Sequence, residues 1–332
     1  MTQQEHADPE HTDSPHVDPV RVGLVGLGVI AGTHLAVLAE RPDVELEFTV
    51  DPKAVEPVVF RGGKPPHYGD LGSALAGHRP DLLVLATPTP THAELVTEAL
   101  LGSTARVLVE KPLVHDRASL AALRELDGTA DVRGRVFTAH HFAFSPEVDW
   151  AAELIAAHPD WGPVTTITSA FYDPYVLRGP EAFASYVSSW TDSGVNQLSM
   201  LTRFVDLVGL TSLRQTDGGA SAWCVVEFRS RGEAGTARLR SSWLTGSSSK
   251  ESSLVLGRSG VEVWIDHTAM TGFAARRGEL LAAFGNDGRT GRKVAHYRPL
   301  YAGLLSGRPG PVLGFDAAAV ISEIHWGVPE AE

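Results

Sequence analysis

An acid and an amide stand four residues apart in the stretch SWTDSGVNQLSML, as Asp192 and Asn196. An apolar helical run follows, and four residues span just over one helical turn, so both side chains can point to the same side. A carboxylate can accept a proton, whereas an amide at neutral pH can only hold a hydrogen bond. The pair indicates a site where Asp192 does proton chemistry and Asn196 positions its partner. The alternative is that Asp192 only caps the helix that starts near Ser193.

A lysine follows a buried strand in the stretch VLVEKPLVHD, where Glu110, Lys111 and Pro112 stand in succession. Most lysines are solvated surface charges. That role does not account well for a lysine that stands between an acid and a rigid proline at the end of a buried strand. Pro112 fixes its own φ, and the preceding peptide bond could be cis. We therefore expect Lys111 to serve the chemistry of a site, and we expect Glu110 and Lys111 to contact a cofactor in the adjoining crevice.

A glycine-rich turn joins the first strand to the first helix in GLGVIAG, which places Gly26, Gly28 and Ala31 in a GxGxxG/A pattern. Glycines allow a tight turn and a close approach of the backbone to a pyrophosphate, and the amides at the helix start bind its charge. Because the pattern lies between a strand and a helix, it predicts a dinucleotide site that also involves Val29 and Ile30.

An acid closes the second strand, ELEFTVD, at Asp51. A carboxylate at this point accepts hydrogen bonds from the adenosine ribose hydroxyls and repels a 2′-phosphate, so NAD is favoured over NADP. Lys53 lies close enough in sequence to weaken that preference. The alternative is that Asp51 merely ends the strand.

A second loop, ATPTPTH, follows the next buried strand and borders the same crevice of a parallel sheet. Thr87 and Pro88 are candidates for the wall of the nicotinamide ribose site. His92 begins a helix, and it is either part of the cofactor site or a local hydrogen-bonding residue.

Composition excludes several classes of function. The chain has 332 residues and a formal charge of −12, which disfavours binding to nucleic acid and to anionic membrane surfaces. No apolar run reaches the length of a membrane span, and no signal peptide is recognisable. The single cysteine, Cys224, has no partner for an internal disulfide and is interpreted as a small buried hydrophobe, which fits a reducing cytoplasm.

The pattern of expected secondary structure changes near residue 145. Before it, apolar strands alternate with helices, which predicts βαβ units and a parallel sheet. After it come extended runs such as SAWCVVEFRS and GVEVWID, rich in valine and aromatics and joined by Gly and Ser turns. These runs predict a mostly antiparallel sheet in an α/β protein.

The glycine turn, TPxxxH, EKP and the later DxGxN occur in the order and spacing of a known family, and the chain resembles the glucose–fructose oxidoreductase / inositol dehydrogenase superfamily. The resemblance implies a Rossmann domain, a C-terminal α/β domain with a large open sheet, and a catalytic role for Lys111. It also implies a homo-oligomer, most simply a dimer formed through the open sheet face. The expected boundaries are a disordered tail at 1–18, the Rossmann domain at 19–144, a substrate-binding and oligomerisation domain at 145–314, and a C-terminal helix at 315–332 that returns to the first domain.

Most members carry a histidine where Asn196 stands, and the Asp-then-Asn form is similar to a branch of aldose 1-dehydrogenases acting on L-arabinose or D-galactose. That similarity implies sugar contacts from His141 and Trp243. Where the branch has an acidic sugar ligand, this chain has Tyr172 or Asp173. Simpler interpretations are that His140 or His141 faces the core and that Trp243 only packs in the sheet.

The predicted function is hydride transfer between a sugar or sugar-like polyol and a nicotinamide cofactor, with NAD preferred over NADP and without a metal. The favoured reaction is oxidation of an aldose at C1 to the lactone. Asp192 is the expected base, Lys111 the group that stabilises the oxyanion, and Asn196 the positioning group. Two other functions remain open: a ketosugar reductase in sugar or antibiotic tailoring, and a non-catalytic sensor that binds the nucleotide.

Overall fold

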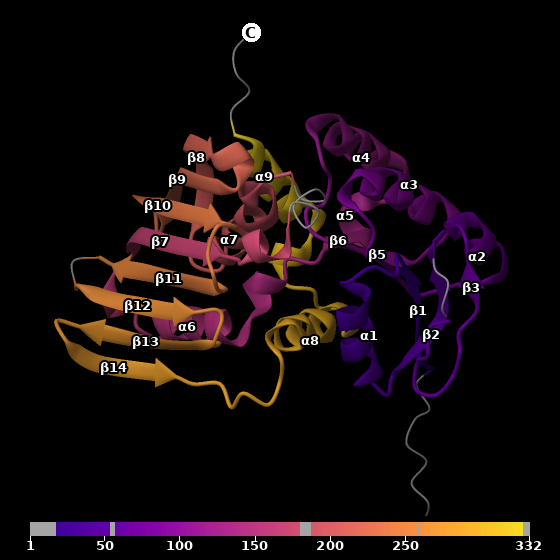
Figure 1. The fold of residues 1–332 in the computed structure, drawn as a ribbon, viewed down its shortest axis with the longest axis horizontal. Coiled ribbons are helices and arrows are strands. Elements are labelled where there is room, and N and C mark those ends of the chain that lie inside the picture. The colour runs from indigo at the N-terminus through magenta and orange to yellow at the C-terminus, as the bar shows by residue number, and fades with distance from the viewer. Residues whose placement is uncertain (1–17, 54–56, 180–186, 258, 328–332) are drawn as a thin grey trace, which may run out of the picture.

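The computed structural model describes residues 18–53, 57–179, 187–257 and 259–327, so the predicted tail at 1–18 lies almost wholly outside the described residues. Two sheets form the two halves of the molecule, and helices α7, α8 and α9 lie between them (Figure 1). This arrangement confirms the α/β fold with a Rossmann domain followed by a mostly antiparallel sheet. No helix in the described part of the chain is long and apolar enough to cross a membrane.

The N-terminal sheet has six parallel strands in the order β3-β2-β1-β4-β5-β6. This order is that of a dinucleotide-binding fold, in which the crevice lies outside the carboxyl ends of the strands. Its strands are β1 Val20–Val25, β2 Val44–Val50, β3 His67–Tyr68, β4 Leu82–Leu85, β5 Arg106–Val109 and β6 Val136–Thr138. The helices that follow them are α1 Ala31–Ala39, α2 Leu71–Gly77, α3 His92–Gly102, α4 Arg117–Ala130 and α5 Val132–Arg135.

The C-terminal sheet has eight strands in the order β14-β13-β12-β11-β7-β10-β9-β8, and only the β7–β10 pair is parallel. Its strands are β7 Val164–Tyr172, β8 Asp206–Thr216, β9 Ser221–Ser230, β10 Glu233–Ser242, β11 Ser249–Leu256, β12 Val261–Asp266, β13 Thr271–Arg276 and β14 Glu279–Phe284. Cys224 is buried on β9, where burial raises the pKa of its thiol to about 12. It therefore serves as a small apolar core residue.

Helices from the second half of the chain contribute to both cores. One face of the C-terminal sheet packs against α6 Pro146–Ala157 and α7 Val195–Leu201. Helix α8, Arg292–Leu305, packs with α1 on one face of the Rossmann sheet. Helix α9, Phe315–Trp326, places its first turns in the core on the other face and its later turns in the C-terminal core. The chain thus returns twice to the first domain, through α8 and α9, and these helices lie between the two sheets (Figure 1).

Candidate active site

A lysine and an aspartate from different domains meet between the two sheets. Lys111 follows the carboxyl end of β5, and its Nζ lies 3.1 Å from Oδ1 of Asp192 and 3.0 Å from the main-chain oxygen of the same residue. Their side chains are only 13% and 10% exposed. Because the ion pair is largely withdrawn from water, its electrostatic field is stronger than that of a surface pair. The structure thus brings together the two residues expected to carry the chemistry.

A π-helical turn, Trp190–Gly194, presents Asp192 just before α7. Trp190 anchors this turn, because its indole nitrogen donates to the main-chain oxygen of His325 at 2.9 Å and its ring stacks on that imidazole. A Cβ at Gly194 would lie 2.4 Å from the Trp190 ring, so this position needs glycine. The N-cap positions of the turn and of α7 are Ser189 and Gly194, so Asp192 is not the helix cap. Turns of this kind are frequent at functional sites.

Asn196 lies on α7 beside the acid and is buried. Its Nδ2 donates to the main-chain oxygen of Asp192 at 3.3 Å, so it steadies the backbone of the turn and not the carboxylate. Its Oδ1 is buried and has no hydrogen-bond partner among the residues the structure describes. An unsatisfied buried acceptor is costly, so this oxygen is a candidate acceptor for a substrate hydroxyl.

His141 pairs with His296, a histidine that belongs to no motif in the sequence. Its Nδ1 lies 3.2 Å from Nδ1 of His296, and its ring stacks on Tyr297 with centroids 4.9 Å apart. Burial lowers the pKa of His141 well below its usual value and that of His296 to about 3. Both imidazoles are therefore neutral near pH 7, and one of the two Nδ1 atoms donates to the other. The neighbouring His140 is the one that faces the core, since it is 1% exposed.

The glycine turn fits a dinucleotide. Gly26 has φ +90°, and a Cβ there would lie 2.6 Å from the main-chain oxygen of Ala86, so only glycine is accommodated. Asp51 accepts hydrogen bonds from the main-chain N–H of Leu27 and of Lys53, both at 2.8 Å. Burial would raise the pKa of Asp51, but these two amides hold it below its usual value. Asp51 is thus a charged residue that also shapes the turn.

The outer side of the same turn is open. A Cβ at Gly28 would meet nothing within 4 Å, and Val29 is 93% exposed. Ile30 is the N-cap residue of α1, and it has a helical backbone conformation. The start of α1 therefore faces free space in which a phosphate can approach the backbone.

His92 connects the two loops that border this space. Its Nε2 lies 2.9 Å from the main-chain oxygen of Thr87, and its Nδ1 lies 2.9 Å from that of Pro112. The residue is fully buried, and burial lowers the pKa of its imidazole. His92 therefore links the loop of Thr87 and Pro88 to the loop that follows Lys111. The Lys111–Pro112 peptide bond is cis.

Glu110 lies behind Lys111 in a buried network. Its Oε1 accepts from the Tyr297 hydroxyl and lies 3.1 Å from Nε2 of His34, whose Nδ1 is 2.7 Å from the Tyr301 hydroxyl. Burial would raise the pKa of Glu110, but His34, Tyr297 and the Lys111 charge hold it below its usual value. Glu110 therefore ties α1 to α8, and it contacts protein groups where we expected the cofactor.

The remaining predicted sugar contacts lie at the end of β7 and the end of β10. Asp173 forms an ion pair with Lys250, whose Nζ also lies 3.5 Å from the main-chain oxygen of Tyr172. Trp243 is 2% exposed and packs against Tyr175, with ring centroids 5.6 Å apart. Lys250 and His296 are new members of the site, and no motif in the sequence points to either.

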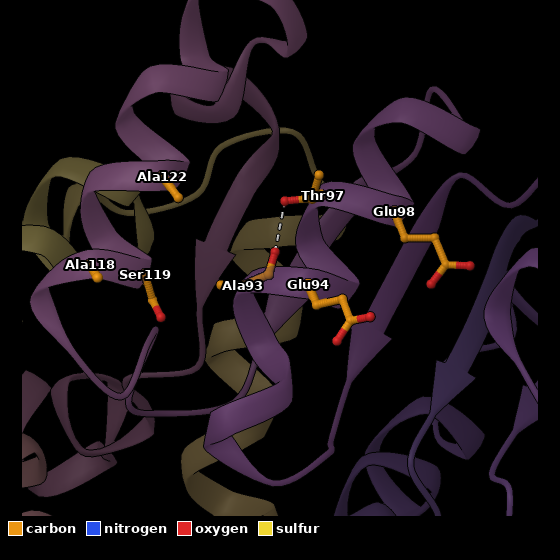
Figure 2. Close-up of a pocket in the computed structure, with 7 residues that line it drawn as sticks. All are labelled: Ala93, Glu94, Thr97, Glu98, Ala118, Ser119 and Ala122. Atoms are coloured by element: carbon orange, nitrogen blue, oxygen red, sulfur yellow. Dashed lines mark hydrogen bonds between the residues drawn. The ribbon is translucent and has the colours of Figure 1, made fainter.

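Figure 2 shows a separate hollow on the outside of the Rossmann domain, between α3 and α4. Its lining residues are Ala93, Glu94, Thr97, Glu98, Ala118, Ser119 and Ala122. None of the predicted site residues contributes to it. Small side chains and two carboxylates give no convergent set of groups for chemistry, so the space around Lys111 and Asp192 is the better candidate. No group of residues in the described part of the chain has a metal-binding arrangement.

Comparison with known proteins finds a family match for the N-terminal domain. Residues 20–141 match the model of the Gfo/Idh/MocA family, described as an oxidoreductase family with an NAD-binding Rossmann fold. The match covers the domain that holds the glycine turn, Lys111 and His141, so the resemblance to this family is confirmed there. No curated protein matches the chain.

Several solved structures share the whole two-domain fold. GenD2 from gentamicin A biosynthesis, in complex with NAD, is 22% identical with TM-score 0.71, over 97% of this chain and 95% of that one. KijD10, a 3-ketoreductase from Actinomadura kijaniata in complex with TDP-benzene and NADP, is 19% identical with TM-score 0.72. The match covers 94% of this chain and 98% of that one. A myo-inositol dehydrogenase from Corynebacterium glutamicum is 19% identical with TM-score 0.69. The match covers 92% of this chain and 94% of that one. These similarities concern the fold.

Proposed function

We propose, from the membership of its N-terminal domain in the Gfo/Idh/MocA oxidoreductase family, that this NAD(P)-dependent dehydrogenase oxidises a sugar, with C1 of an aldose as the reacting carbon. The observation that carries the proposal is the contact of Lys111 Nζ with the Asp192 carboxylate at 3.1 Å. It joins a base to a cation at the edge of the crevice where the cofactor is expected.

Oxidation at C1 removes a hydride from carbon and a proton from the anomeric hydroxyl. The nicotinamide, when bound, takes the hydride. Asp192 takes the proton, which a carboxylate can do because a hemiacetal hydroxyl is more acidic than an ordinary secondary alcohol. Lys111 stabilises the negative charge that develops on that oxygen. Asn196 accepts a sugar hydroxyl through its unpartnered Oδ1 and holds the ring in place.

The test is a panel of sugars with NAD and with NADP, followed by the absorbance of the reduced nicotinamide. Asp192→Asn keeps the size of the side chain and removes the base, so it should lower kcat about a hundredfold or more. Asp287→Asn, at an exposed aspartate, is the matched control and should leave kcat unchanged. A folded Asp192→Asn variant with nearly full activity would assign the proton to another group.

NAD is the proposed cofactor because Asp51 ends β2 as a charged residue beside the glycine turn. The neighbouring solved structures contain NAD in one case and NADP in another. The negative charge of Asp51, which repels a 2′-phosphate, favours NAD.

Reduction of a ketosugar is the second candidate, since hydride transfer is reversible and Lys111 with Asp192 can also supply a proton. A sensor without activity is disfavoured because both residues are present and in contact. Any reduction of cofactor by a sugar would rule out the sensor, and activity only with a ketone and reduced cofactor would favour the reductase.

We further propose that the chain forms a homodimer through the outward face of the C-terminal sheet. This face is not a continuous apolar surface, because charged and small polar residues dominate it. It does expose Trp223, which is 54% accessible and lies between the guanidinium groups of Arg214 and Arg240. Light scattering should give twice the mass of one chain, and Trp223→Glu should shift it toward one. A single-chain mass for the wild type at micromolar concentration would rule the dimer out.

A further inference from the structure

An arginine at the start of α8 has no carboxylate in direct contact among the described residues. Arg292 forms no ion pair and no hydrogen bond within the described ranges, and its Nη1 is buried without a partner. Burial lowers the pKa of this guanidinium. A buried charged donor that is left unpaired is costly, so proteins normally supply it with a partner or bring one with a ligand.

The carboxylates that influence Arg292 are each engaged elsewhere. Their partners are Lys250 for Asp173, His267 at 3.0 Å for Glu147, and the main-chain amides of Thr268 and Ala269 for Asp266. None of them lies within ion-pair distance of the guanidinium in the described part of the chain. These three acids attract Arg292 from a distance, but each is hydrogen-bonded to another group, so none of these described carboxylates accepts a hydrogen bond from the guanidinium.

Arg292 and Lys250 share one aromatic platform. The Arg292 guanidinium lies 5.8 Å from the Phe142 ring and the Lys250 ammonium 5.5 Å from the Phe171 ring. The two rings are 4.9 Å apart. Both cations therefore stand over the same buried surface, and their contact with the rings offsets part of the cost of burying them.

This platform adjoins the catalytic pair. The charge on Lys250 interacts with that of Asp192, and His141, next to Phe142 in the chain, is influenced by both Lys111 and Arg292. Lys111 is balanced by Asp192, and Lys250 is balanced by Asp173. Of these three cations, all in the described part of the chain, Arg292 is the one without a carboxylate in contact.

We propose that Arg292, supported by Lys250, binds a carboxylate on the substrate, so that the enzyme acts on a sugar acid. This inference rests on the proposed dehydrogenase function and adds the class of sugar. A planar guanidinium binds a carboxylate through two parallel hydrogen bonds, and such a ligand would satisfy the unpartnered Nη1 of Arg292. The carboxylate lies at the end of the sugar remote from the carbon that Asp192 serves.

The experiment compares D-galactose, D-galacturonate and D-galactose 6-phosphate, which differ at the far end of the ring. Wild type should oxidise the uronate with a kcat/KM at least about tenfold above the other two, as expected for a charged hydrogen-bonded pair. Arg292→Met keeps the length of the side chain and removes the charge. It should lower kcat/KM for the uronate by roughly 10- to 100-fold and change that for galactose by less than about threefold. Arg292→Lys should recover part of the loss, and Arg289→Met, at an exposed arginine, should change neither.

Equal losses for the uronate and galactose in a folded Arg292→Met variant would overturn the carboxylate site, as would a wild-type preference for galactose or its phosphate. If none of the three compounds is oxidised, the dehydrogenase proposal fails for this sugar series. Calorimetric binding of D-galacturonate in the presence of NAD then still tests the subsite. Binding to wild type that is lost in Arg292→Met supports it, and no binding, or equal binding to both, overturns it.

Discussion

At the scale of single residues, Lys111 and Asn196 contact the same aspartate in different ways, so their substitutions should differ in effect. Lys111→Ala removes the cation beside the carboxylate and should lower kcat by about a hundred- to a thousandfold, the range of one electrostatic stabiliser of a transition state. Asn196→Ala removes one hydrogen bond to the main chain and one acceptor, so it should raise KM or lower kcat by about ten- to a hundredfold. Steady-state kinetics on the same sugar decides the order, and an Asn196→Ala loss exceeding that of Lys111→Ala would contradict these roles.

The side chain of Asp51 is expected to select the cofactor and to accept hydrogen bonds within the turn. One substitution removes both functions, and kinetics with the two cofactors distinguishes their effects. Asp51→Ser removes the charge that repels a 2′-phosphate, so the ratio of kcat/KM for NAD to that for NADP should fall by roughly tenfold or more. It also removes the acceptor for the Leu27 and Lys53 amides, so activity with both cofactors should drop. Asp287→Ser, at an exposed aspartate after β14 in the second half of the chain, is the control. An unchanged cofactor ratio would show that Asp51 does not select the cofactor.

The sequence predicted the residues that belong to motifs and missed those that do not. Lys111 and Asp192 could be paired in advance because each stands in a short pattern with an unusual neighbour, and the structure brings them into contact. Arg292, His296 and Lys250 are isolated basic residues in unremarkable stretches, and only the packing of α8 and β11 brings them to the site. Their position beside the site is a consequence of tertiary structure, which local spacing does not reveal.

At the scale of elements, α8 is the main feature that the sequence did not predict. Its stretch carries arginine, lysine, histidine and Pro299 inside the helix, so the apolar period of a core helix is obscured. It nevertheless packs with α1, because Tyr297, Leu300, Tyr301 and Leu304 are fully buried. By contrast β1 and β9, with plain apolar or alternating patterns, lie where the sequence predicted them.

The buried network between α1, β5 and α8 should contribute measurably to stability. Tyr297→Phe removes a donor to the Glu110 carboxylate and should lower the free energy of unfolding by about 1–3 kcal/mol, the cost of an unsatisfied charged acceptor. Tyr301→Phe is the matched control, because that hydroxyl contacts the His34 ring and not a carboxylate, and its loss should cost about 1 kcal/mol or less. Urea unfolding of both variants gives the comparison. Equal losses would show that the Glu110 charge is not supported by Tyr297.

At the scale of the whole molecule, the two sheets are not independent units. Helix α9 has its first residues in the Rossmann core and its later ones in the C-terminal core, and α8 links the site to α1. Catalytic residues from both halves are held by these shared helices, as the bond from the Trp190 indole to the last turn of α9 illustrates. Loss of either core should therefore disorganise the site.

Acid should destabilise the whole molecule at a higher pH than carboxylate titration alone would suggest. Burial lowers the pKa of His140 and His296 to about 3 and that of His325 to about 4, against 6.5 for an accessible imidazole. The unfolded chain takes up these protons near pH 6.5 and the folded chain does not, so stability falls as the pH drops below that value. These three groups alone should give a slope of about 4 kcal/mol per pH unit below about pH 6, at 1.4 kcal/mol for each, and His141, whose pKa burial also lowers, adds to it.

Urea unfolding between neutral pH and mildly acidic pH measures this slope. His140 is the residue to replace, because neither ring nitrogen has a partner among the described residues, and His140→Leu therefore breaks no hydrogen bond. The variant should lose about 1.4 kcal/mol per pH unit of the slope, the contribution of one proton. His115→Gln, at an exposed imidazole, should leave the slope near its wild-type value. A wild-type stability that stays level across this range, or a His140→Leu slope equal to that of wild type, would show that the buried imidazoles accept protons in the folded state.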